Sequence, residues 1–198
     1  MQKYIIGIDE VGRGPLAGPV VVTALLMPGS LRLINSKLGQ LKDSKQLTEK
    51  QREAWSRFLR HHPDIYFATS RVNPKMIDRI NISVAANRAA FRTCERVIKK
   101  SGISKKSIRI FLDGGLYLGS KALQGASART VIKGDEKITV VKAASILAKV
   151  HRDRFMVNLA KIYPKYGFDI HKGYGTKVHR EAIAAFGPAP VHRLTFLK

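Results

Sequence analysis

The N-terminal part of the chain holds two apolar runs separated by a short glycine-rich segment, and this arrangement constrains the fold more than any other feature of the sequence. Tyr4–Asp9 (YIIGID) has the composition of an isoleucine-rich strand, and Pro19–Met27 (PVVVTALLM) is an almost continuous apolar run. Such a run is typical of a strand buried on both faces. The connecting segment EVGRGPLAG is rich in glycine, so we expect the two strands to form a hairpin.

Three further segments have the pattern of strands, and helical patterns fill the intervals between them. The strand candidates are Ile65–Val72, Ser107–Leu112 and Ala128–Lys133. Strands that come first as a hairpin and then alternate with helices predict an α/β protein. We expect a mixed five-stranded sheet flanked by helices.

Helices are predicted from capping residues and apolar periodicity. Thr48 and Gln51 form a capping box ahead of an apolar face. Asn73–Pro74 is typical of an N-cap and a first-turn proline, and apolar residues then recur at helical spacing as far as Gly102. The remaining helices are expected over Val140–Tyr163, which is ended by Pro164, and over Lys177–Phe186.

The charge balance predicts a polyanionic partner. The 198 residues include 36 Lys and Arg against 14 Asp and Glu, which gives a formal net charge of +22. Nucleic acid is the first candidate and an anionic membrane the second. The membrane is the weaker candidate, because no apolar run approaches the roughly 20 residues that span a bilayer.

The single cysteine indicates the cellular compartment, and the absence of repeats and linkers indicates the number of domains. Cys94 lies on the apolar stripe that precedes Gly102, which predicts a buried, unreactive thiol. One cysteine excludes an internal disulfide and fits a reducing, cytoplasmic compartment. The sequence has no internal repeat, low-complexity tract or linker. We therefore expect one domain over residues 1–198, with a monomer as the default state.

Carboxylates follow three of the predicted strands. Asp9 and Glu10 follow YIIGI, Asp113 follows RIFL, and Asp135 follows TVIKG. Because ligands of α/β sheets tend to bind at the carboxyl ends of strands, these groups are expected to converge. Successive side chains of a regular strand point to opposite faces. Asp9 and Glu10 are therefore expected to share a site only where the strand ends or bulges.

A cluster of carboxylates repels itself unless cations neutralise it, and oxygen ligands without a Cys/His pattern favour Mg²⁺ or Mn²⁺. The alternative is that each carboxylate simply forms a turn. Asp113–Gly114 and Gly134–Asp135 are ordinary turn dipeptides, and for either pair alone a turn is the more common explanation. For Asp9–Glu10, which lies between an apolar strand and Gly12–Gly14, a turn is the poorer explanation.

The sequence Gly12-Arg13-Gly14 has two interpretations. It is either a flexible hairpin loop or a segment in which two glycines let the backbone come close to a sugar or phosphate. In the second case Arg13 would contact a phosphate.

In combination, these segments resemble the ribonuclease HII family of bacteria. The segment GIDEVGRGPLAGPVV (Gly7–Val21) resembles the N-terminal signature of that family. Further matches follow in the order of the family over nearly the whole chain: DSKQL (Asp43–Leu47), LDG (Leu112–Gly114), KGD (Lys133–Asp135), AASILAKVHRD (Ala143–Asp153), HKGYGT (His171–Thr176) and HRLTF (His192–Phe196).

The resemblance implies a ribonuclease H-like fold and endonucleolytic hydrolysis of RNA in RNA–DNA hybrids, leaving 5′-phosphate and 3′-hydroxyl ends. It also implies a cut on the 5′ side of single ribonucleotides in duplex DNA, as in ribonucleotide excision repair. By position, Asp9, Glu10, Asp113 and Asp135 would bind two Mg²⁺ or Mn²⁺ ions, with Asp9 bridging both. The family pattern places no ligand at Glu136.

The resemblance also implies substrate contacts. Gly12, Arg13 and Gly14 would hold the ribonucleotide through its 2′-hydroxyl and the adjoining phosphate. Tyr174 would stack on the deoxyribose that follows and so identify the RNA-to-DNA junction. Glycines suit this role, because the 2′-hydroxyl has to be recognised at short range.

Several other polar residues have competing explanations. Ser44 and Lys45 would contact the uncleaved strand, and a solvated loop is an equally good explanation. Asp153 lies four residues after Lys149 on a predicted helix, which predicts a surface ion pair rather than a metal ligand. His171 is expected to form a hydrogen bond within the fold rather than to contact phosphate.

Two classes of function remain to be compared. One is a metal-dependent endoribonuclease that acts on hybrids, and the other is a basic nucleic-acid-binding protein without catalysis. Charge alone favours the binding protein, because it needs only Lys and Arg. A binder gains nothing from acids at three strand ends, where they would repel phosphates. The carboxylates therefore favour the nuclease.

Overall fold

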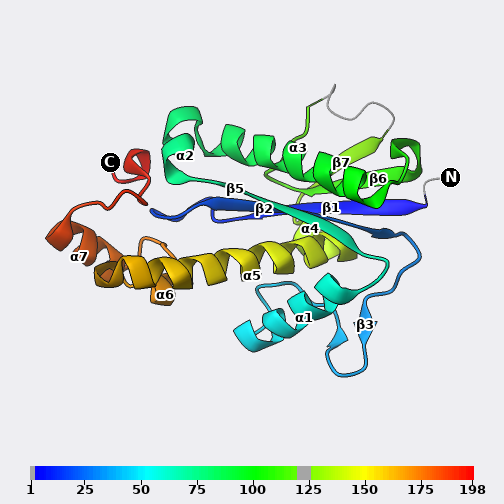
Figure 1. Cartoon of the computed structure of the whole chain (residues 1–198), viewed down its shortest axis with the longest axis horizontal. Coiled ribbons are helices and arrows are strands. Elements are labelled where there is room, and N and C mark those ends of the chain that lie inside the picture. Colours follow the sequence, from blue (N-terminus) through cyan, green and yellow to red (C-terminus); the bar gives the residue numbers. More distant parts are fainter. Residues whose placement is uncertain (1–2, 120–125) are drawn as a thin grey trace.

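The structure, a computed structural model, describes residues 3–119 and 126–198. Its centre is a five-stranded sheet with helices on both faces (Figure 1). Across the sheet the strands follow the order β5-β2-β1-β6-β7. Their bounds are β1 (Tyr4–Val11), β2 (Val20–Pro28), β5 (Tyr66–Val72), β6 (Ile108–Asp113) and β7 (Ser127–Val131).

The sheet is mixed, which confirms the predicted fold class. β1 and β2 form the expected hairpin and pair antiparallel from Tyr4↔Pro28 to Val11↔Val21. β5 pairs antiparallel with β2, while β6 pairs parallel with β1 and β7 parallel with β6. β1 therefore lies in the middle of the sheet, with a neighbour on each side.

Helices form where they were predicted, with one correction. The sequence predicts one helix from Asn73–Pro74 to Gly102, whereas the structure has two, α2 (Pro74–Ile80) and α3 (Ile82–Ser101). Asn81 separates them, because its φ of 61° is left-handed and its side chain accepts a hydrogen bond from the first turn of α3. The other helices are α1 (Glu49–His61), α4 (Gly134–Lys137), α5 (Thr139–Ile162), α6 (Phe168–His171) and α7 (Lys177–Phe186).

The shortest elements were not predicted. α4 and α6 have four residues each, too few for apolar periodicity to reveal. A two-stranded ladder, β3 (Ile34–Asn35) with β4 (Gly39–Gln40), follows the N-terminal hairpin. Within the described residues, no helix is long and apolar enough to cross a membrane.

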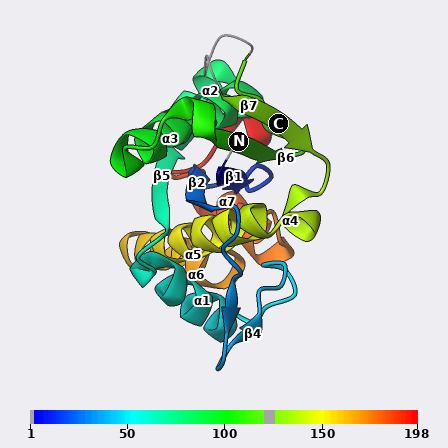
Figure 2. The ribbon, with the colours of Figure 1, turned by 90° about the vertical axis from the view of Figure 1, so that its right-hand side faces the viewer.

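Helices cover the two faces of the sheet unequally (Figures 1 and 2). α3 packs on one face, and its apolar core includes the buried Cys94, whose pKa burial raises to about 12. This confirms the buried thiol. α5 and α1 pack on the other face, around Trp55 and Leu147. A smaller core joins the C-terminal half of α5 to α6 and α7.

β1 and α5 approach each other unusually closely at Gly7. A Cβ atom added there would lie 2.4 Å from the carbonyl carbon and oxygen of Val140 and 2.6 Å from the nitrogen of Val141. Distances this short are far inside van der Waals contact, and backbone atoms cannot rotate away as a side chain can. Glycine at this position therefore sets the distance between the sheet and α5.

Replacing this glycine tests the contact. Gly7→Ala should lower the free energy of unfolding by about 1–3 kcal/mol, because the methyl group forces α5 away from β1. Urea unfolding monitored by circular dichroism measures the change. Gly29→Ala is the control, since a Cβ there meets no atom closer than 3.5 Å. Equal losses in the two variants would contradict the explanation.

Candidate functional site

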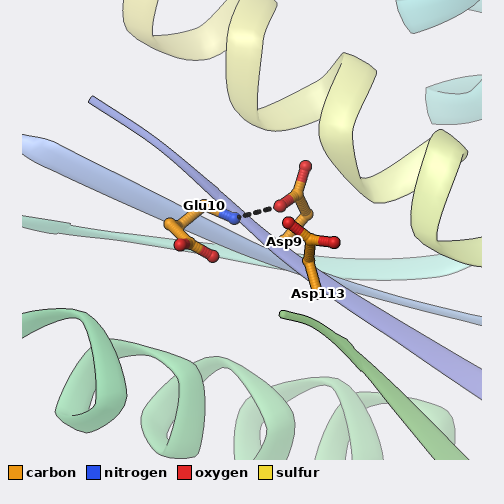
Figure 3. A group of neighbouring side chains, drawn as sticks. All are labelled: Asp9, Glu10 and Asp113. Atoms are coloured by element: carbon orange, nitrogen blue, oxygen red, sulfur yellow. Dashed lines mark hydrogen bonds between the residues drawn. The ribbon is translucent and has the colours of Figure 1, made fainter. Parts of the chain in front are cut away.

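Three carboxylates meet where β6 ends beside β1. Asp9 and Glu10 come from β1, and Asp113 is the last residue of β6 (Figure 3). One oxygen of each carboxylate lies within 4.8 Å of the others. The pairing of β1 with β6 stops at Ile8↔Leu112, so this edge of β1 is open beside Asp9 and Glu10.

The expectation that β1 ends or bulges at Asp9 and Glu10 is wrong. Both residues lie inside the strand and stay in register with β2, as Asp9↔Thr23 and Glu10↔Val22. Asp9 extends toward α5 and Glu10 toward the opposite side of the strand (Figure 3). They share a site because the neighbouring strand β6 ends here, rather than because β1 does.

Burial and the charges of neighbouring carboxylates raise the pKa values of Asp9 and Glu10. Asp9 is buried, and desolvation followed by the charges of Glu10 and Asp113 raises its pKa well above the ordinary value. Hydrogen bonds from the Ser145 hydroxyl and from the Glu10 N–H, the latter 2.8 Å long, oppose that shift. Desolvation raises the pKa of Glu10 to about 7, although Arg13 lowers it.

The group is chemically suited to a divalent cation. Glu10 Oε2 is buried and has no hydrogen-bond partner among the described residues, which is costly unless another group satisfies it. A cation would satisfy this oxygen and also relieve the repulsion between the carboxylates. The donors are all carboxylate oxygens, which suit hard cations such as Mg²⁺ or Mn²⁺.

Asp135 belongs to a neighbouring carboxylate group rather than to the first three. Its oxygens gather with those of Asp43 and Glu136. The Lys45 ammonium lies 2.9 Å from Asp135, and this hydrogen bond raises the pKa of Lys45. The two groups are adjacent, because the N–H of Gly134, the residue before Asp135, donates to Asp113 Oδ1 at 2.8 Å. The structure therefore brings three of the four predicted carboxylates together and places Asp135 beside them.

The Gly12–Gly14 segment borders the first carboxylate group. The Arg13 guanidinium lies 3.4 Å from Glu10 Oε1 and donates to the Ser83 hydroxyl of α3 at 3.0 Å. Gly12 has a φ of 89°, and a Cβ there would lie 2.3 Å from Nε of Arg152. Gly14 is exposed, and a Cβ there would meet no atom within 4 Å. The segment is therefore closely packed on its inner side and open on its outer side.

Tyr174 lies on a loop held against the same segment. Its side chain is 41% exposed. The carbonyl of the preceding residue, Gly173, accepts hydrogen bonds from the N–H groups of Leu16 and Ala17 at 2.8 and 3.3 Å. The Tyr174 carbonyl accepts one from His179 Nδ1 at 2.9 Å, and burial lowers the pKa of that histidine to about 4. The loop is thus fixed at two successive residues.

The structure decides several of the competing explanations. Ser44 is buried and its hydroxyl lies 2.9 Å from that of Ser145, so the solvated loop is wrong for Ser44, whereas Lys45 is exposed. His171 is confirmed as structural, because its ring bonds to the Tyr166 carbonyl and the Gly173 N–H. The ion pair of Asp153 with Lys149 is confirmed at 2.9 Å, but Asp153 is buried rather than on the surface.

Sequence reasoning missed three residues that support this site. The Ser145 hydroxyl lowers the pKa of Asp9, and two fully buried arginines, Arg152 and Arg193, lie behind the Gly12–Gly14 segment. Each lies in a segment that matched the family pattern, AASILAKVHRD or HRLTF. Only their burial among backbone carbonyls, which a sequence does not reveal, indicates what they contact.

Comparison with known proteins agrees with the geometry. The family model "Ribonuclease HII" matches residues 6–198. The chain is 42% identical over 203 residues to the ribonuclease HII of Fusobacterium nucleatum, covering 99% of this chain and 86% of that protein. It is 41% identical over 194 residues to that of Chlamydia pneumoniae, covering 98% and 83%. The crystal structure of ribonuclease H2 from Pyrococcus horikoshii superposes with a TM-score of 0.72 at 27% identity, covering 97% of this chain and 93% of that chain.

The raised pKa of Glu10 predicts a pH-dependent stability. The folded protein holds this proton up to a pKa of about 7, against an ordinary value of 4.5. The wild type should therefore lose stability relative to Glu10→Gln as the pH rises through this interval. The difference should reach roughly 3 kcal/mol above it. Urea unfolding in EDTA at about pH 5 and pH 8 measures the difference.

The control for this experiment is Glu95→Gln, which removes an exposed carboxylate that lies 3.9 Å from Lys105 on the surface. Its stability relative to wild type should change little between the two pH values. A Glu10→Gln difference that is the same at both pH values would contradict a proton held by burial.

Proposed function

This chain belongs to the ribonuclease HII family and is a ribonuclease H enzyme, and we propose that it hydrolyses RNA in RNA–DNA hybrids and cuts on the 5′ side of single ribonucleotides in duplex DNA. The observation that carries the proposal is the group of Asp9, Glu10 and Asp113, in which a buried oxygen of Glu10 lacks a hydrogen-bond partner among the described residues, directly beside Gly12–Gly14. A carboxylate group beside a loop suited to ribose and phosphate is expected of a nuclease and not of a simple binder.

We propose that Asp9, Glu10, Asp113 and Asp135 hold two divalent cations, Mg²⁺ or Mn²⁺. When bound, such cations would activate a water for attack on the phosphate and stabilise the leaving oxygen, giving 5′-phosphate and 3′-hydroxyl ends. The resemblance to the family makes Asp9, whose carboxylate extends toward α5 (Figure 3), the residue that would contact both cations. The Ser145 hydroxyl, which lies 2.9 Å from that of Ser44, lowers the pKa of Asp9 and so favours its charged form.

The proposed substrate contacts follow the borders of the site. Arg13 is anchored by Glu10 and Ser83 with a third of its side chain still exposed, so its charge can attract a phosphate. Gly12 and Gly14 permit the backbone to approach the 2′-hydroxyl, which is the local difference between RNA and DNA. We propose that Lys45, which is exposed and paired with Asp135, contacts the uncleaved strand. Ser44, the other residue assigned to that strand by the resemblance, is buried against Ser145.

We propose that Tyr174 recognises the RNA-to-DNA junction. Its ring is exposed on a loop that is bonded to the segment after Gly14 through the carbonyl of Gly173. The two elements proposed to contact the substrate are therefore tied together through the backbone. The ring would stack on the deoxyribose that follows the ribonucleotide.

The net positive charge of the chain contributes to duplex binding without regard to the sugar. A formal charge of +22 predicts that affinity for any duplex falls steeply as salt rises.

We also propose that residues 1–198 act as one domain and as a monomer. The single buried cysteine is consistent with the cytoplasmic location that we propose.

The central test uses a labelled DNA duplex with one ribonucleotide. The wild type should make a single cut on its 5′ side with Mg²⁺ or Mn²⁺, and EDTA should abolish the cut. Asp9→Asn should lower the cleavage rate by more than about a hundredfold, because the loss of a metal ligand removes several kcal/mol of transition-state stabilisation. Gel analysis of the end-labelled strand measures both the position and the rate.

The matched control is Asp64→Asn, which changes an exposed aspartate in a turn before β5 and should leave the rate unchanged. Salt-sensitive binding of the duplex without cleavage under either metal would overturn the proposal in favour of a non-catalytic binding protein.

Junction recognition is tested through Tyr174. Tyr174→Ala should lower kcat/KM for the single-ribonucleotide duplex by about tenfold or more, since loss of an aromatic stacking contact costs about 1–3 kcal/mol. The loss should be smaller for a hybrid with a continuous RNA strand, which offers no deoxyribose at that position. Tyr174→Phe keeps the ring and is the control. Equal losses on both substrates would refute a junction-specific role.

A further inference from the structure

Two arginines are fully buried behind the Gly12–Gly14 segment. Arg152 comes from α5 and Arg193 from the segment after α7, and both have 0% exposure. Among the described residues, every hydrogen bond of the two guanidinium groups ends on a backbone carbonyl oxygen. Burying a charge is costly, so an apolar side chain would suit a position that only filled space. The contacts of these charges therefore require an explanation.

Arg193 binds both ends of one loop. Its Nη2 donates to the Gly12 carbonyl at 2.6 Å and to the Gly18 carbonyl at 2.9 Å. Its Nη1 donates to the Arg13 carbonyl at 2.7 Å, and Nε donates to Gly18 at 3.0 Å. The Arg193 N–H also donates to the Leu16 carbonyl at 2.8 Å. One residue thus fixes the direction of the peptide groups at the beginning and at the end of this loop.

The direction of the carbonyls determines the direction of the N–H groups. The described chain contains no cis peptide bond, and in a trans peptide the C=O and N–H point in opposite directions. Because the Gly12 carbonyl points inward to Arg193, the N–H of Arg13 points outward. The Gly14 N–H points outward for the same reason, since the Arg13 carbonyl is held inward.

These two N–H groups are available to a ligand. Among the described residues, neither the Arg13 N–H nor the Gly14 N–H donates a hydrogen bond. Gly14 is exposed, and open space surrounds the position that its Cβ would occupy. Two adjacent free donors on the outer side of a loop can bind a hydroxyl oxygen and a phosphate oxygen.

We propose that Arg193 is a positioning residue for ribonucleotide recognition: by holding the carbonyls of Gly12 and Arg13 inward, it presents the N–H groups of Arg13 and Gly14 to the 2′-oxygen and the adjoining phosphate. The inference rests on the proposed function of the Gly12–Gly14 segment. Arg193 itself touches no substrate in this arrangement and acts only through the loop. A lysine cannot replace it, because one ammonium lacks the planar fork that reaches three carbonyls.

Arg152 has a separate role in the same region. It donates to the carbonyls of Ala17 and Pro19 at 3.2 and 3.0 Å and to that of Lys172 at 2.9 Å, but to neither Gly12 nor Arg13. Its guanidinium lies 5.7 Å from the centre of the Tyr174 ring. The peptide groups that would meet the ribonucleotide therefore depend on Arg193 and not on Arg152.

Binding without metal tests the proposal without cleavage. Fluorescence anisotropy in EDTA gives the ratio of Kd for an all-DNA duplex to Kd for the same duplex with one ribonucleotide. In Arg193→Lys this ratio should fall about tenfold toward one, as expected for the loss of two aligned hydrogen bonds. The Kd for the all-DNA duplex should stay unchanged, because the charge is conserved. Arg154→Lys, which alters an arginine paired with Glu53 away from the loop, should keep the wild-type ratio.

The outcomes separate the inference from the function on which it rests. A wild type that discriminates, with an Arg193→Lys variant that discriminates equally well, would overturn the role of Arg193 alone. A wild type that binds both duplexes equally would overturn the proposed function of the loop and the inference with it. A variant that loses affinity for both duplexes equally would point to general damage and would also overturn the inference.

A second measurement on the wild type covers the case in which Arg193→Lys does not fold. The amide protons of Arg13 and Gly14 should exchange readily in the free protein and become protected by the single-ribonucleotide duplex, but not by the all-DNA duplex. NMR-detected hydrogen exchange in EDTA measures this. Protection that is equal for both duplexes, or absent for both, would refute the outward presentation of these groups.

Discussion

The contact between β1 and α5 is the constraint on which the rest of the site depends. At Gly7 the two backbones are so close that even a Cβ would overlap with Val140. This contact brings Ser145, one and a half turns further along α5, to the Asp9 carboxylate, and Arg152, two turns beyond that, to the loop after Gly12. A single helix therefore supports both the carboxylates and the substrate loop, because glycine lets it lie directly against the strand that carries them.

Much of the fold could be predicted from the sequence, because its longer elements carry local signals. The capping box of Thr48 and the apolar run of β2 are properties of neighbouring residues, and both appear as expected. Asn81 shows the limit, because the apolar stripe continues across it and only its capping hydrogen bond to Val84 reveals a new helix. The spacing of apolar residues cannot reveal a helix break across which that spacing continues.

The site was predictable in its chemistry but not in its geometry. The sequence showed that Asp9 and Glu10 are unusual, yet it could not show that the open edge arises from the end of β6, since strand pairing is a long-range property. Nor could it show that Asp135 gathers with Asp43. The role of Arg193 was hidden for the same reason, because its partners lie on a loop far away in the sequence.

Charge is used in opposite ways on the two sides of the Gly12–Gly14 segment. On one side, burial and the neighbouring carboxylates raise the pKa values of Asp9 and Glu10, and the group is suited to cations. On the other side, the buried guanidinium groups of Arg152 and Arg193 donate hydrogen bonds to backbone carbonyls and fix the shape of the loop that follows Gly12. The exposed positive charge is separate from both and attracts any duplex, whatever its sugar. In the function proposed above, affinity comes from the surface charge, whereas the shape of the loop distinguishes RNA from DNA.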